Sequence, residues 1–414
     1  MHPAFPLHAL AALALLLSSS SSFAGTNAFW LQPGRTPGGS GSQSDPWIVS
    51  QPEDFDARLR AIPTNSVITL LPGVFETYGS GAPGQPGFFV KNGWTVQGAG
   101  IHRTTVRLVG CILDQHPGSG VGRVFFSGWG PGVERVVLRD LTVDCNERGV
   151  RARMKADDLT LSAVFLMGRE HRVERIKAIN ALGRRTLPGG NPECFVIALS
   201  PRDDSTDATG YFVEDCEVSS FAGGSVTAIA LLGTGGRNGA TGALRRNRVV
   251  LGGTGGEFGF SAYGAGGFVI EHNVTRQAAR AFNWDTAAPG RDLTIRNNQF
   301  LQCTGWALTL GGGGDSIVED NVIELAGPNA LGVQISARNE IFPGAGAWII
   351  RNNTFRARSG TPMVVRFFRG VPVPGCQFVG NRIDPRLRHD PSAAKFDTWR
   401  ANVDLRNRPV QAPR

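Results

Sequence analysis

Residues 292–300 read DLTIRNNQF, residues 347–355 repeat them almost unchanged as AWIIRNNTF, and residues 316–323 (SIVEDNVI) form a looser copy. The shared unit is an apolar residue, two variable residues, Asn and, two places later, a second apolar residue or Thr. Units that recur every few tens of residues indicate a stacked array in which each unit covers its neighbours. The fourth place holds Asn247, Asn273, Asn298, Asn321, Asn353 and Asn381, and three upstream versions have Leu141, Ile176 and Cys216 there.

The spacing of these fourth positions varies from 23 residues, between Asn298 and Asn321, to 40, between Ile176 and Cys216. A spacing that never falls below 23 residues but exceeds it by irregular amounts indicates one repeating coil that carries insertions of different length. Each unit contains short stretches of period-two alternation, and no helix-length apolar period separates them. The sequence therefore predicts an all-β, single-stranded solenoid of parallel strands, with coils about 4.8 Å apart.

The repeated Asn has a structural explanation. A tight bend between two strands favours a residue that tolerates left-handed backbone angles and bonds to its own backbone. Stacked coils would place the Asn side chains above one another, so that each amide bonds the next. We expect such a ladder, rather than ligand binding, to account for the repeated Asn.

Two stretches near the start of the array carry a family resemblance. Residues 68–76 (ITLLPGVFE) and 95–106 (TVQGAGIHRTTV) are similar to the strings that open the first coils of right-handed parallel β-helix proteins of the pectate-lyase-like superfamily. The likeness covers roughly residues 65–385 and implies that fold. It implies no particular activity, because many chemistries share this scaffold.

The segments outside residues 65–385 are expected to close the ends of the solenoid. Residues 25–64 are predicted to form an irregular segment and a short capping helix, with Ser50 and Glu53 as its capping box. Residues 386–414 lose the repeat and are predicted to form a non-repetitive C-terminal cap. Such caps protect the strand edges that an open solenoid leaves unpaired.

Residues 1–24 have the pattern of a signal peptide. The unbroken apolar run at residues 9–17 is followed by five serines, and the small residues Ser22 and Ala24 favour cleavage after Ala24. The run is too short to cross a membrane, which takes about 20 apolar residues. We therefore expect an exported protein (periplasmic, extracellular or on the cell surface) with no membrane span in the mature chain.

The formal net charge is +8, and only four of the 42 basic residues are Lys. The planar fork of arginine suits carboxylate, sulfate and phosphate groups. In an exported protein, this composition favours an acidic polysaccharide as partner over nucleic acid. A general preference for Arg on a solvated basic surface explains it equally well. We expect a monomer.

The six cysteines could form disulfides, because export permits them. Cys303 and Cys376 are too many repeats apart to meet, so we expect them to be buried thiols. The candidate pairs are Cys111 with Cys145 and Cys194 with Cys216, each about one repeat apart.

Alignment of the repeats predicts which residues of the strand between two Asn units face outward. A saccharide groove needs hydroxyl partners, a stacking ring and charges for uronate groups, whereas a solvated sheet face is the alternative. Trp306 and Met363 are assigned inward by this alignment. The outward residues are Ser261, Tyr263, Asn283, Asp285, Thr309, Gln334 and Arg366, with Arg202 further up the same row, and the adjoining loops add Asp203, Asp204 and Arg338.

Asp285, in the run FNWDT at residues 282–286, is the strongest single candidate. It is a carboxylate beside aromatic residues in the middle of the array, where it could bind Ca²⁺, act as an acid or hydrogen-bond a turn. Tyr263, Arg338 and Arg366 are the candidate bases, although the high pKa of arginine makes it an awkward base.

Complete catalytic signatures of related β-helix enzymes are absent. Residues 203–204 (DD) match one part of a polygalacturonase-like site, but no Gly-His-Gly exists, and residues 175–177 (RIK) lie upstream instead of downstream. The Asp-Pro-His of alginate epimerases is approached only by residues 389–391 (HDP), in the wrong order. A pectate-lyase-like Arg-x-Pro-x-x-Arg is missing.

Three functions fit the sequence. The first is a lyase that removes the proton beside a uronate carboxylate after Ca²⁺ or arginines neutralise that carboxylate; an epimerase would share this step. The second is a non-catalytic β-helix that binds glycan or has a structural role. The third is a glycoside hydrolase that pairs Asp203 or Asp204 with Asp285 as its two carboxylates.

Overall fold

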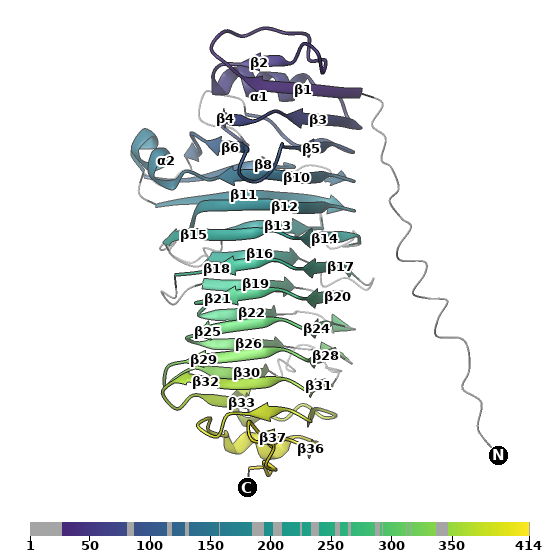
Figure 1. Ribbon diagram of the computed structural model, residues 1–414, viewed down its shortest axis with the longest axis vertical. Coiled ribbons are helices and arrows are strands. Elements are labelled where there is room, and N and C mark those ends of the chain that lie inside the picture. The colour runs from purple at the N-terminus through teal and green to yellow at the C-terminus, as the bar shows by residue number, and fades with distance from the viewer. Residues whose placement is uncertain are drawn as a thin grey trace, which may run out of the picture.

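The strands form one long coil (Figure 1). The computed structural model describes residues 27–80, 87–113, 118–128, 132–156, 158–183, 194–201, 209–223, 226–232, 240–252, 257–263, 266–285, 290–291, 293–311, 313–314, 316–336 and 347–413. Within these ranges, 35 strands join a single sheet in which each coil pairs in parallel with the next. The predicted right-handed parallel β-helix is thereby confirmed.

Each full coil contributes strands to three faces. The first face contains β3 (Ser66–Leu70), β5 (Thr95–Gln97), the start of β10 (Val137–Asp144) and of β12 (Arg172–Gly183), β14 (Tyr211–Glu214), β17 (Ala240–Arg245), β20 (Gly266–Glu271), β24 (Thr294–Arg296), β28 (Ser316–Glu319), β31 (Trp348–Arg351), β34 (Gln377–Val379) and β36 (Thr398–Arg400). The second contains β4 (Gly73–Thr77), β6 (Thr104–Leu108), the ends of β10 and β12, β15 (Glu217–Gly223), β18 (Arg248–Val250), β21 (Val274–Arg276), β25 (Gln299–Cys303), β29 (Val322–Ala326), β32 (Thr354–Ser359), β35 (Arg382–Ile383) and β37 (Val403–Asp404). The third contains β8 (Ser119–Phe126), β11 (Asp158–Arg169), β13 (Cys194–Ser200), β16 (Val226–Leu232), β19 (Glu257–Tyr263), β22 (Arg280–Asp285), β26 (Trp306–Gly311), β30 (Leu331–Ser336) and β33 (Met363–Phe367).

The parallel stack extends beyond residues 65–385 at both ends. At the N-terminal end, β1 (Asn27–Pro33) pairs with β3, and β2 (Trp47–Val49) pairs with β1. At the other end, β36 and β37 pair with β34 and β35. Outside the three faces lie β7 (Ile112–Leu113), which pairs with β8, β9 (Val133–Glu134), which pairs with β11, and the separate pair β23 (Gly290–Arg291) and β27 (Gly313–Gly314).

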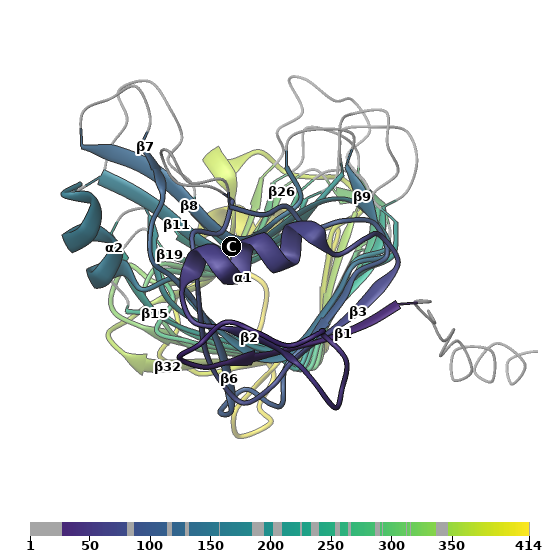
Figure 2. The ribbon, with the colours of Figure 1, turned by 90° about the horizontal axis from the view of Figure 1, so that it is seen from above.

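Helix α1 (Pro52–Ala61) lies across the N-terminal end of the stack (Figure 2). It buries Phe55 and Leu59 against the first coils. The predicted capping box is wrong: Ser50 Oγ donates to Asp54 Oδ2 at 2.7 Å, and no side chain caps the helix. Pro52 at the first turn suits a helix start, because its missing N–H would have no partner there anyway.

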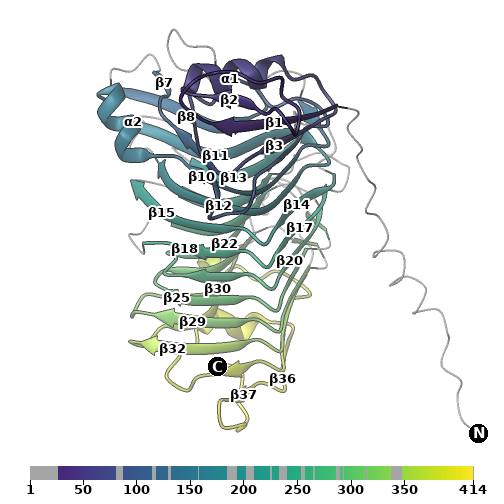
Figure 3. The same cartoon turned by 45° about the horizontal axis from the view of Figure 1, so that its top comes forward.

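Three shorter helical elements lie beside or below the stack. Helix α2 (Glu147–Met154) projects from its side near the N-terminal end (Figure 3). The 3₁₀ turns η1 (Phe368–Gly370) and η2 (Pro391–Lys395) lie near the C-terminal end. There Phe396 packs on Phe367 with ring centroids 4.8 Å apart, and so covers the last coil.

The predicted Asn ladder is present inside the coil. Asn298 Nδ2 donates to Asn321 Oδ1 at 2.9 Å and to the Ile270 carbonyl at 2.8 Å, while its Oδ1 accepts from the amide N–H of Asn273 at 2.9 Å. Buried backbone groups at each corner are satisfied by this repeating pattern. The chain of Asn-to-Asn bonds runs through Asn247, Asn273, Asn298, Asn321, Asn353, Asn381 and Asn402.

One detail of the corner differs from the prediction. The residue with left-handed backbone angles is the one before the ladder Asn, such as Asn297 with φ 55° and Asp320 with φ 54°. The preceding residue makes the bend, and this turns the next side chain inward. Asn298 therefore serves as an internal hydrogen-bonding group rather than as the left-handed residue.

All six cysteines are buried, and none of them forms a disulfide. The predicted pairs Cys111–Cys145 and Cys194–Cys216 are therefore not disulfides, whereas Cys303 and Cys376 are buried thiols as expected. Burial in the apolar coil raises the pKa of Cys194 to about 11. These thiols behave as small apolar core residues. No helix in the described part of the chain is long and apolar enough to cross a membrane.

Asp56 is a buried acid between α1 and the first coil, and we predict that it makes stability fall as pH rises. It is 1% exposed, accepts from Thr77 Oγ1 at 2.5 Å and from the Tyr78 N–H at 3.0 Å, and desolvation raises its pKa to about 7. Its contribution is complete below the unfolded pKa near 4 and is lost toward pH 7, at about 1.4 kcal/mol per pH unit. Melting temperatures of Asp56→Asn and wild type between pH 4 and 8 should show this slope only in wild type. A parallel slope in both proteins would contradict the prediction.

Candidate functional site

A row of outward side chains follows the third face. Strand register places Ser261, Asn283, Thr309, Gln334 and Arg366 next to one another, as alignment of the repeats predicted. The described side chains on either side of them in each strand belong to the hydrophobic core. The row therefore faces away from the core, and we call it the outer row.

The outer row is not an ordinary solvated sheet surface. Ser261 is 0% exposed, Asn283 6% and Gln334 3%, although all three turn away from the core. The Oγ of Ser261 and the Oγ1 of Thr309 are buried and have no hydrogen-bond partner among the described residues. Because an unpaired buried hydroxyl costs about 1–3 kcal/mol, both groups are suited to bind a ligand.

Register also brings the two strongest candidates together. Tyr263 pairs with Asp285 across the ends of β19 and β22. The structure describes the backbone of both residues, and their side chains lie outside the described part. Arg202, predicted further up the row, and the three loop candidates Asp203, Asp204 and Arg338 lie outside the described residues altogether.

The expected Ca²⁺ site rests on Asp285 alone. Among the described side chains, no group of three or more His, Cys, Asp or Glu is arranged to hold a metal ion. The outer row itself offers one amide oxygen each from Asn283 and Gln334, and the Gln334 oxygen already accepts from Arg366 at 2.6 Å. The described part of the row is therefore suited to hydroxyl and anionic groups rather than to a cation.

Trp306 and Met363 face outward, which corrects their predicted inward placement. Both lie in register with Arg280 and Leu331 in a second outward line, and neither Trp306 nor Met363 belongs to the core clusters. The strands bend here, so that two consecutive residues, as at Ala307 and Leu308, both point into the core. Strict alternation fails across this bend.

Trp306 is the centre of a stack of rings and guanidinium groups. The Arg280 guanidinium carbon lies 4.8 Å from the Phe258 ring centroid and 4.6 Å from that of Trp306. The Arg366 guanidinium carbon lies 5.5 Å from the Trp306 centroid, and its Nε and Nη2 donate to Gln334 Oε1 at 3.0 and 2.6 Å. The Arg366 guanidinium is thus held over the Trp306 ring and, along its Nε/Nη2 edge, by Gln334.

The N-terminal half of the outer row is apolar. Phe126, Phe165, Ala198 and Ala230 precede Ser261 in register and form a small cluster separate from the main core. Phe126 and Phe165 contact each other edge to face at 6.0 Å. The row therefore changes along the molecule from aromatic, through small and hydroxylated, to amide and guanidinium side chains, which repeat alignment did not detect.

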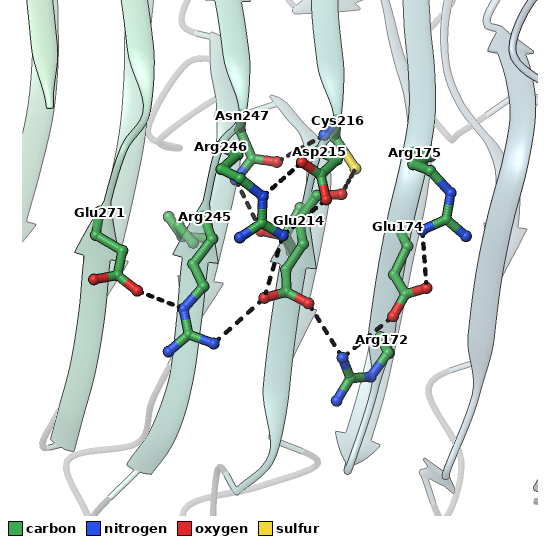
Figure 4. Close-up of polar contacts among 12 residues, drawn as sticks. Arg172, Glu174, Arg175, Glu214, Asp215, Cys216, Arg245, Arg246, Asn247 and Glu271 are labelled. Atoms are coloured by element: carbon green, nitrogen blue, oxygen red, sulfur yellow. Dashed lines mark hydrogen bonds and ion pairs between the residues drawn. The ribbon is translucent and has the colours of Figure 1, made fainter. Parts of the chain in front are cut away.

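The first face carries a different arrangement, a ladder of acidic and arginine side chains that alternate except at Glu174 and Glu214 (Figure 4). Arg245 lies between Glu214 and Glu271, with nitrogen–oxygen distances of 3.4 and 2.7 Å. Beside it Arg246 binds Asp215 at 2.7 Å, and this bond holds the pKa of Asp215 below its usual value. The main column contains Arg139, Glu174, Glu214, Arg245, Glu271, Arg296, Glu319 and Arg351.

The charge ladder gives part of the arginine content a structural role. Arg245, Arg296 and Arg351 are paired with acids on neighbouring coils, so they stabilise the stack rather than offer free cations. Single surface ion pairs contribute little, and networks of several charges contribute more. The basic composition therefore does not by itself identify a binding surface, and Arg366, which forms no ion pair with a described residue, is more informative.

Comparison with known proteins gives the fold and nothing finer. No known family model matches the chain, and no curated protein matches it. The tailspike protein of E. coli bacteriophage HK620 is similar, with a TM-score of 0.60 and 12% identity over 88% of this chain and 65% of the tailspike. A mutant of that tailspike in complex with a pentasaccharide gives 0.59, with the same identity and shares. The A-module of a mannuronan C-5 epimerase of Azotobacter vinelandii gives 0.48, with 14% identity over 88% of this chain and 97% of the module. The chain is a parallel β-helix, and at these identities the likeness extends no further.

Proposed function

We propose that this protein is an exported β-helix that binds an acidic polysaccharide along the outer row of its third face and cleaves it as a lyase. The observation that carries the proposal is the outer row itself, where shielded hydroxyl and amide groups lead to Arg366. The tailspike of the same fold is in complex with a pentasaccharide, which supports a glycan as the ligand.

The proposed reaction is a β-elimination. A base removes the proton on the carbon next to the uronate carboxylate, and the bond from the adjacent carbon to the glycosidic oxygen breaks. A carbon–carbon double bond forms, and the departing oxygen takes up a proton. Neutralisation of the carboxylate by arginine stabilises the enolate-like intermediate. We assign the base to Tyr263, because arginine gives up its proton too reluctantly.

Asp285, next to Tyr263 in register, is the residue that would hold Ca²⁺ if the reaction uses it. Bound there, the ion would add positive charge beside the uronate carboxylate. Carboxylate oxygens are the ligands that Ca²⁺ prefers.

The test is to incubate the purified protein with a panel of uronate polymers, with Ca²⁺ or with a chelator, and follow ultraviolet absorbance of the unsaturated product. We expect product from at least one acidic polymer and none from a neutral glucan. Absence of product from the whole panel would sink the lyase assignment.

Binding without catalysis is the second candidate. It is favoured by the absence of a carboxylate among the described side chains of the outer row. In that case the same polymers would bind and remain intact, and substitution of Asp285 would leave the affinity unchanged.

A further inference from the structure

The environment of Arg366 suggests a specific role within the proposed site. Its guanidinium is half-buried and forms no ion pair with any described residue. Gln334 accepts from Nε and Nη2, so the group presents its Nη1 edge in a fixed direction. A guanidinium edge matches the two oxygens of a carboxylate, which a lysine cannot do.

Trp306 also restricts the orientation of the Arg366 guanidinium, by contact with its face. Its ring lies beneath the Arg366 guanidinium at 5.5 Å and against that of Arg280 at 4.6 Å. Phe258 contacts the far side of Arg280 at 4.8 Å. The two rings and two guanidinium groups, which come from four coils, thus hold one another in place. Because Arg366 is already ordered, it would lose less conformational entropy on binding a ligand.

We infer that Arg366 is the carboxylate-binding group that makes the outer row selective for acidic sugar units, and that Trp306 and Gln334 are positioning residues that act through it. The inference rests on the proposed function and identifies the residue of that site that recognises the uronate carboxylate. A neutral sugar or a methyl ester of the same unit leaves the Nη1 edge without its charged partner and so binds less tightly.

Gln334→Glu provides the sharpest test. The side chains have nearly the same shape, but the new carboxylate would pair with Arg366 and compete with the ligand. We would measure calorimetric binding of a tetrasaccharide of 1,4-linked uronate and of its methyl ester. Wild type should prefer the acid by about 10-fold to 100-fold, the range of one charge-assisted hydrogen bond. Gln334→Glu and Arg366→Gln should both abolish that preference by lowering acid binding to about the level of ester binding.

Trp306→Leu separates positioning from general packing. It should weaken acid binding about 10-fold, and this loss should disappear when Arg366 is already Gln, because the ring acts through that residue. Arg276→Gln, which alters an exposed arginine on β21 of the second face, is the matched control and should change neither ligand. Melting temperatures confirm that each variant is folded.

The outcomes separate the two proposals. If acid and ester bind equally to wild type, or if Arg366→Gln keeps the preference, the role of Arg366 is overturned while a glycan-binding function stands. If neither ligand binds wild type at millimolar concentration, the acidic-glycan function and this role fail together.

Discussion

Asn298→Ala is expected to lower the free energy of unfolding by about 3–5 kcal/mol. This is the largest stability effect that we predict for a single substitution. The substitution leaves the Asn273 N–H without its acceptor and removes the Nδ2 donor to the Ile270 carbonyl and to Asn321 Oδ1, which keeps the bond from the backbone N–H of residue 298. Each unpaired buried group costs about 1–3 kcal/mol. Against a typical total of about 5–15 kcal/mol, the loss would bring the protein close to unfolding at growth temperature.

The neighbouring residue provides a matched control. Asn297 has φ 55°, a left-handed backbone angle that glycine adopts readily, so Asn297→Gly should change stability by less than about 1 kcal/mol. Denaturant midpoints and melting temperatures of the two variants, measured side by side, decide the matter. Equal effects of the two substitutions would contradict the ladder account.

Asp285→Asn is expected to lower kcat about 10²–10³-fold on an acidic polymer that wild type cleaves, the range for loss of one group that stabilises the developing charge, because the variant lacks the carboxylate that would hold Ca²⁺ beside the uronate. Its place beside Tyr263 at the ends of neighbouring strands motivates the prediction. The change removes the charge and keeps the shape of the side chain, so oligosaccharide affinity should fall far less than turnover. Initial rates and binding constants for the same polymer provide the comparison.

The control for Asp285 is another acid outside the third face. Glu324 on β29 pairs with Arg358 at 3.4 Å, and Glu324→Gln should leave kcat within about twofold of wild type, because a surface ion pair contributes only about 0–1 kcal/mol. If Asp285→Asn retains full turnover while its melting temperature is unchanged, Asp285 has no catalytic role.

The fold was predictable because the repeat records it directly. Each Asn unit marks one corner of one coil, and alignment of the units placed Ser261, Asn283, Thr309, Gln334 and Arg366 in their true register. The same alignment also contains the charge ladder, because the first variable position is Arg or Glu in every unit except the last, where it is Val379.

The alignment failed where the backbone departs from alternation. Trp306 was assigned inward because every second residue of a strand normally shares a face. The strands of the third face bend, and two consecutive residues enter the core there. The sequence has small residues in register at this bend, and they are Gly259, Ala281, Ala307 and Gly332.

The disulfide prediction failed for a different reason. Cysteines one repeat apart satisfy the spacing requirement, but a disulfide also needs the two side chains to point at each other at short range. Sequence spacing indicates the coil on which each cysteine lies, but not the direction in which its side chain points. The loops that hold Asp203, Asp204 and Arg338 follow no repeat at all, so no register predicts their place.

The most direct measurement is a crystal structure of Asp285→Asn with an acidic oligosaccharide bound. We predict that the glycan lies along the outer row between Ser261 and Arg366, with a carboxylate on the Arg366 guanidinium. A glycan seated instead on the charge ladder of the first face, or an empty outer row in crystals soaked at a saturating concentration, would contradict the account.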